Sequence, residues 1–177
     1  MTGRRPFTRL GVAGLGAHVF YELAAGVGMP LASVLGPTAA AGVWGAGTVG
    51  GLRAASRWPA SRDGVFAAVN ALGLAAVLGH LASWPRTRRF GLPWLRSCEG
   101  MGPELMPAYN VILDVSALGA AAGLLSENRR ARRRWALAGL ALAPVLAVAQ
   151  HAEHRALTRR AHAQPGWWNR RLVEAAP

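Results

Sequence analysis

The sequence predicts an all-α protein, an integral membrane bundle of about five transmembrane helices. Of its 177 residues 52% are hydrophobic, and charged residues are excluded from long stretches of the chain. Residues 10–52 contain no arginine, one histidine (His18) and one carboxylate (Glu22). A bilayer core about 30 Å thick needs roughly 20 apolar residues in a helix, which fits the length of these stretches. A helix on the surface of a soluble protein would instead carry a charged face.

The longest apolar stretch is predicted to form two helices. Gly26, Gly28 and Pro30 interrupt it, because glycine frees the backbone and proline lacks the amide hydrogen that a helix interior needs. We therefore expect a first span at about residues 10–28 and a second at about 31–52, joined by a tight turn.

Three further spans follow along the chain. Residues 64–84 form the third, which Pro85 ends, and the longest loop separates it from the fourth at 105–126. The fifth covers about 135–151. Residues 1–155 are thus predicted to be the bundle, and 156–177 a basic tail whose paired tryptophans suit a membrane interface.

The basic residues are placed as membrane anchors. All 20 are arginines, the net charge is +12, and clusters such as residues 129–134 lie between apolar segments. Arginines at helix ends face anionic lipid headgroups, which makes membrane lipids the predicted partners. No basic groove interleaved with aromatic residues is present, which argues against nucleic acid. Arginine counts place the N-terminus in the cytoplasm by a small margin, in a multi-pass protein of the cell membrane.

Small residues indicate that the helices pack closely. Gly47 and Gly51 have GxxxG spacing, and so do Gly119 and Gly123. Glycines four residues apart share a helix face and let two backbones approach, which is how helices associate in lipid. We expect these four glycines at helix contacts.

The polar residues of the spans converge on one side of the membrane. Because alternate spans run in opposite directions, His18, Glu22, His80, Asp114 and His151 all fall in the same leaflet. His18 and Glu22 are four residues apart and share a helix face. An unpaired carboxylate in lipid costs several kcal/mol, roughly, so such groups face the bundle interior or a wet cavity.

This convergence predicts a polar pocket with an acid–base role. Glu22 and Asp114 are the predicted catalytic residues, since two ionisable groups at depth can take opposite proton roles. The predicted substrate-binding or supporting residues are His18, Tyr21, His80, Tyr109, Asn110 and His151. The alternative is that these side chains only join helices by hydrogen bonds.

Two short patches resemble a known family. Residues Phe20-Tyr21-Glu22 in one span and Leu113-Asp114 in a later one resemble the small integral-membrane terpene cyclases of meroterpenoid pathways. The resemblance implies that Glu22 or Asp114 protonates an epoxide or alkene of an isoprenoid-type, lipid-soluble substrate. The chain departs from that family in having five expected spans rather than seven, and in having few aromatic residues to shelter a cation.

Two other functions remain open from the sequence. His80 and His151 would be the best axial pair for a haem-binding or quinone-linked redox protein. The second open function is that of a non-enzymatic subunit, which packs against a larger membrane protein. No phosphate-binding loop, HExxH or paired-cysteine motif is present, and Cys98 is the single cysteine, so no metal or other cofactor is predicted.

Overall fold

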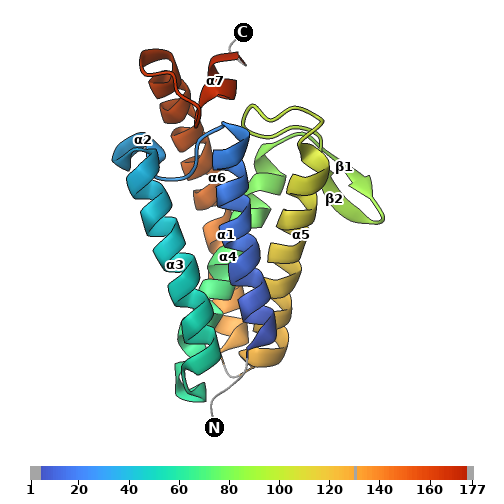
Figure 1. Ribbon diagram of the computed structural model, residues 1–177. Coiled ribbons are helices and arrows are strands. Elements are labelled where there is room, and N and C mark those ends of the chain that lie inside the picture. The colour runs from blue at the N-terminus through green and yellow to red at the C-terminus, as the bar shows by residue number, and fades with distance from the viewer. Residues whose placement is uncertain (1–4, 130, 175–177) are drawn as a thin grey trace.

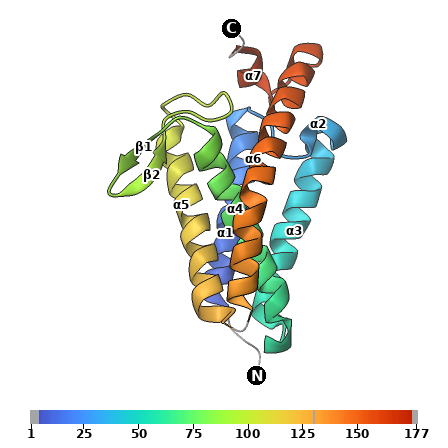
Figure 2. The same cartoon turned by 180° about the vertical axis from the view of Figure 1, so that it is seen from behind.

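The computed structural model describes residues 5–129 and 131–174 and consists mainly of long helices that run side by side (Figure 1). These helices are α1 (Pro6–Ala25), α3 (Pro37–Arg57), α4 (Asp63–Ser83), α5 (Met106–Ala122) and α6 (Arg132–Ala163). The short helices α2 (Ala32–Leu35) and α7 (Arg170–Glu174) lie at one end of the bundle, and the start of α1 lies at the other (Figures 1 and 2). A 3₁₀ turn, η1 (Ala60–Arg62), joins α3 to α4, and a π-helical turn, η2 (Gly123–Glu127), extends α5.

The break between the first two long helices has a backbone cause. Gly26 and Gly28 have φ angles of 82° and 90°, in the left-handed region that glycine adopts without steric cost. The chain then turns through α2, and Gly36, with φ 80°, precedes Pro37 at the start of α3. Proline suits that first helical position because the amide there has no partner within the helix.

Among the residues that the structure describes, three helical segments are long and apolar enough to cross a membrane, rather than the five expected. They are Ala60–Ser83, Met106–Glu127 and Arg133–Ala163. Helices α1 and α3 are of similar length but fall short in composition. The cause is their glycines together with ionisable residues, which lower the mean hydropathy. Among the ionisable residues are Arg9, His18 and Glu22 in α1 and Arg53 and Arg57 in α3.

Glycines set the closest helix crossing, between α1 and α5. A Cβ atom on Gly119 would lie 2.5 Å from the backbone nitrogen of Gly11, and one on Gly14 would lie 2.7 Å from the Cα of Ser116. Gly51 lies against Val12, and Gly123 against Asn70. The expectation for Gly47 is wrong, because no atom lies within 4 Å of a Cβ built there. Gly47 is exposed on α3, although Gly51, one turn later, packs against Val12.

The predicted tail is largely a continuation of the last helix. Helix α6 extends to Ala163 rather than ending near 151, since no proline or glycine interrupts residues 151–163. Its end is fixed by Arg160, which donates to the carbonyls of Ala32 and Ser33 in α2. Trp168 is buried at 8% exposure, so it packs within the protein, while Trp167 is exposed.

The loop between α4 and α5 folds back over the end of the bundle. It forms a hairpin of β1 (Arg86–Arg89) and β2 (Leu92–Leu95), which turns at Phe90 and Gly91. Leu95 is fully buried, and the backbone of Leu95 is held by Asn110 of α5. The loop is therefore anchored to the bundle, which positions the residues that follow β2.

Candidate functional site

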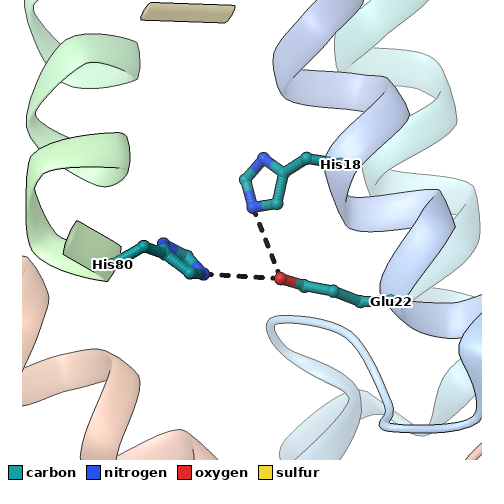
Figure 3. A group of neighbouring side chains, drawn as sticks. All are labelled: His18, Glu22 and His80. Atoms are coloured by element: carbon teal, nitrogen blue, oxygen red, sulfur yellow. Dashed lines mark ion pairs between the residues drawn. The ribbon is translucent and has the colours of Figure 1, made fainter. Parts of the chain in front are cut away.

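Three buried side chains from two helices meet at one carboxylate oxygen (Figure 3). The Nε2 atom of His18 lies 3.6 Å from Oε1 of Glu22, and the Nε2 atom of His80 lies 3.4 Å from the same oxygen. The side chains of all three are at most 4% exposed. We call His18, Glu22 and His80 the central cluster.

The helices explain this geometry. His18 and Glu22 are one turn apart on the buried face of α1, and His80 is in the last turn of α4. The Nδ1 atom of His80 lies 3.1 Å from the carbonyl oxygen of Ala76, one turn back on its own helix, and also contacts the side-chain amide of Gln150. These contacts direct Nε2 of His80 toward Glu22.

Tyr109 completes the surroundings of Glu22. Its hydroxyl donates to Oε1 of Glu22 at 2.5 Å, and the tyrosine is fully buried. The rings of His18 and His80 pack edge to face with centroids 5.2 Å apart, and Tyr109 packs near both. One carboxylate oxygen thus has a phenol and two imidazoles around it.

A cavity of about 390 Å³ lies against the central cluster. Its volume falls within the usual range of roughly 300–1,000 Å³ for small-molecule sites. The central cluster forms its polar wall, and most other lining residues are apolar, contributed by α1, α3, α4, α6 and the turn after α1. Trp44 of α3 is the lining residue with a large aromatic ring. The cavity is therefore suited to an apolar molecule with one reactive or polar group.

The cavity reaches the outer surface of the bundle. Its lining residues Leu31 and Leu72 are 43% and 47% exposed. Helix α3 packs mainly against α1 and α2, and α6 packs mainly against α4 and α7. Both α3 and α6 (Figure 2) contribute residues to the cavity wall. Leu72 lies midway along α4, so the cavity reaches the flank of the bundle there, and apolar side chains of α3 and α6 are also exposed.

The folded-back loop adds Glu99 and Cys98 to the site. Oε1 of Glu99 lies 3.9 Å from Nε2 of His80, and Glu99 lines the cavity. Burial, together with the negative charge of Glu22, raises the pKa of Glu99 to about 8. Burial also raises the pKa of the Cys98 thiol, whose sulfur lies 4.0 Å from the Tyr109 hydroxyl.

The structure does not bring Asp114 together with Glu22. Asp114 is half-buried, does not line the cavity, and makes no hydrogen bond or ion pair within the described ranges 5–129 and 131–174. The alternating directions of the predicted spans gave an expected depth for Asp114 in the membrane. They could not give the side of α5 on which the residue lies. Tyr109 and Leu113 occupy the buried side of that helix, next to α1.

Three predicted supporting residues have structural roles. Asn110 uses its amide to accept from the Leu95 amide and to donate to the carbonyls of Leu95 and Met106. Tyr21 donates to the carbonyl of Leu105 at 3.0 Å. His151 packs against Trp84 and does not line the cavity, so the His80–His151 pair does not form a shared site there.

Sequence reasoning missed the contribution of the loop. Glu99 was visible as a carboxylate on the correct side of the membrane, but its loop position gave no sign that the segment folds inward. Gln150, Glu153 and His154 of α6 also line the cavity.

The donor atoms of the site are close enough to hold a metal ion. One ligand atom each from His18, Glu22 and His80 lies within 4.8 Å of the other two, and the same holds for His80, Cys98 and Glu99. Local sequence motifs do not indicate this grouping, because His80 is separated from His18 and Glu22 by a whole helix and two turns.

Comparisons of the chain with protein-family models, with curated proteins and with solved structures give no match.

Proposed function

We propose that this chain is a multi-pass membrane enzyme that transforms a lipid-soluble substrate, of isoprenoid type, at the central cluster. The observation that carries the proposal is a buried His–Glu–His group, with Tyr109 beside it, on the wall of a cavity whose lining is mostly apolar. Buried ionisable groups that face a cavity are the usual mark of a reactive centre.

The outer surface supports a place in the membrane. Leu137, Leu140, Val145 and Val148 of α6 are 57–69% exposed, as expected for side chains that contact lipid tails. An exposed apolar surface of this extent is rare on soluble monomers. The three apolar helical segments cross the bilayer, and α1 and α3 complete the bundle beside them.

Proton transfer is the chemistry proposed for the cluster. Glu22 contacts two imidazoles and a phenol, all of which can donate or accept protons. His80 replaces Asp114 as the partner of Glu22. Because Trp44 is the one large aromatic ring on the described cavity wall, the site favours isomerisation or another acid–base step over cyclisation through a long-lived carbocation.

A paired substitution tests the proposal. Lipid extracts of a host that expresses the wild-type chain are compared with those of hosts expressing Glu22→Gln or Asp114→Asn. Both changes replace a carboxyl by an amide within the bundle. We expect wild type and Asp114→Asn to change the isoprenoid or quinone profile equally, and Glu22→Gln to abolish the change at equal protein abundance.

Two results would contradict the proposal. Loss of the lipid change in Asp114→Asn but not in Glu22→Gln would move the reactive centre elsewhere. An unchanged lipid profile with all three proteins, together with co-purification of a larger membrane protein, would favour the non-enzymatic subunit.

A further inference from the structure

We propose that the central cluster binds a divalent transition-metal ion, with zinc as its best match, through one nitrogen each of His18 and His80 and a carboxylate oxygen of Glu22. The inference deepens the proposed function by naming the cofactor of the same site. A catalytic role for the metal rests on the proposed function, whereas binding of the metal does not.

The spacing of the donor atoms fits a metal. Four ligands about 2.0–2.1 Å from a tetrahedral zinc ion lie roughly 3.3–3.4 Å from one another. Here the Glu22 oxygen lies 3.4 Å from Nε2 of His80 and 3.6 Å from Nε2 of His18. All three donor atoms lie within 4.8 Å of one another, so a shift of at most about 0.7 Å per histidine side chain would bring them to tetrahedral ligand spacing.

The histidine nitrogens that face Glu22 lack hydrogen bonds of good geometry. Within the described part of the chain, both ring nitrogens of His18 and Nε2 of His80 make no hydrogen bond of normal geometry, although each histidine is 3% exposed and each Nε2 lies 3.4–3.6 Å from the Glu22 oxygen. A buried polar atom left without a partner costs roughly 1–3 kcal/mol. Coordination to a cation would satisfy one nitrogen of each ring at the point where both face Glu22.

His80 and Glu22 also make the supporting hydrogen bonds that metal ligands commonly make in proteins. A metal-bound histidine commonly donates its other ring N–H to a backbone carbonyl, which fixes the tautomer. Nδ1 of His80 is 3.1 Å from the carbonyl oxygen of Ala76, in position to do this. The carboxylate of Glu22 is in turn held by the Tyr109 hydroxyl. These contacts orient two of the three donors before any ion arrives.

A fourth position remains on the cavity side. Three protein ligands with one open position are typical of catalytic rather than structural zinc sites. Glu99 lies next to this position, 3.9 Å from Nε2 of His80. The donor set of two imidazoles and one carboxylate suits zinc and other first-row ions better than magnesium or calcium, which prefer all-oxygen sites.

The test measures binding on the whole chain, purified in detergent with a tag that contains no histidine. After treatment with a chelator, the protein is titrated with Zn²⁺ against a chromophoric competitor, and with Co²⁺ followed by its visible absorption. We expect one equivalent per chain, a tetrahedral Co²⁺ spectrum, and a metal-dependent rise in melting temperature. His18→Ala, His80→Ala and Glu22→Gln should each weaken binding by 100-fold or more.

Two further variants keep the result interpretable. His162→Ala removes an exposed histidine of α6 and should bind metal as wild type does. Tyr109→Phe keeps the ring but removes the hydroxyl that holds Glu22, and should weaken binding by about 10-fold to 100-fold. If a ligand variant fails to fold, Tyr109→Phe still tests the site.

The outcomes separate the two proposals. A well-folded wild-type protein that binds less than a tenth of an equivalent would overturn the metal site. So would equal losses in His162→Ala and His18→Ala. Loss of the lipid change in Glu22→Gln without metal binding would leave the proposed function standing alone. One equivalent of bound metal without any lipid change would support the metal site and contradict the proposed function.

Discussion

Helices α1 and α5 cross where Gly11 of α1 meets Gly119 of α5, and there the two backbones approach each other most closely. A Cβ atom on Gly119 would lie 2.5 Å from the backbone nitrogen of Gly11 and 3.0 Å from its Cα atom. Neither partner is a flexible side chain, so a methyl group at this position would force the helices apart. Helix α1 carries two members of the central cluster and α5 carries Tyr109, so this crossing joins the two helices that surround Glu22.

Substitution of this glycine should destabilise the protein. We expect Gly119→Ala to lower the free energy of unfolding by roughly 1–3 kcal/mol, the usual cost of overpacking, measured by SDS titration in mixed micelles. Gly47→Ala is the matched control, because a Cβ there meets no atom within 4 Å. It should be neutral or stabilising by up to about 1 kcal/mol through helix propensity. Equal effects of the two changes would mean that α1 and α5 do not cross here.

Asn110 should act on the folded-back loop. Its amide makes three hydrogen bonds, two of them to the backbone of Leu95, and the residue is 2% exposed. Asn110→Leu keeps the approximate volume but leaves the Leu95 amide and carbonyl without partners, which should cost about 2–4 kcal/mol for two buried groups. Hydrogen exchange over residues 92–99 should rise in this variant. The control is Ser126→Ala, whose hydroxyl contacts the Ala122 carbonyl at an exposed position.

Unchanged exchange over 92–99 in Asn110→Leu would show that another contact holds the loop. Increased exchange would confirm that Asn110 places Glu99 at the site indirectly, through the backbone, and does not itself contact substrate.

The membrane topology can be tested by cysteine labelling. Ser61 lies in η1 between α3 and α4, and Ser97 lies in the loop between α4 and α5, so a membrane-spanning α4 separates them. In a Cys98→Ser background, Ser61→Cys and Ser97→Cys should react with a membrane-impermeant thiol reagent from opposite sides. Reaction of both from the same side would exclude a transmembrane α4.

The sequence predicted the helical class and the place of the strongest polar pair. His18 and Glu22 could be assigned to one face because a four-residue spacing in a helix has a fixed geometry. His80 could be assigned to the same level because the direction of each span follows from its order in the chain. Both predictions need only local periodicity and the alternation of spans.

The rest depended on tertiary packing. Asp114 lies on a different side of α5 from Tyr109, which its depth in the predicted span could not show, and glycine spacing alone does not show which face of α3 meets another helix. Glu99 reaches the site because Asn110 holds the backbone of Leu95 and so anchors a loop that carries four arginines and two glutamates. The length of α6 was missed because the prediction ended the helix where hydrophobicity stops, although residues 151–163 contain no helix breaker.

The side opening of the cavity has a kinetic consequence. If the chain is the membrane enzyme proposed above, a substrate that enters through this flank would arrive from the surrounding lipid, so its mole fraction among lipids would govern occupancy by mass action. Diluting the vesicles with buffer should then leave the turnover rate per protein unchanged, whereas adding inert phospholipid should lower it. The half-saturation value of the proposed reaction would be a surface concentration.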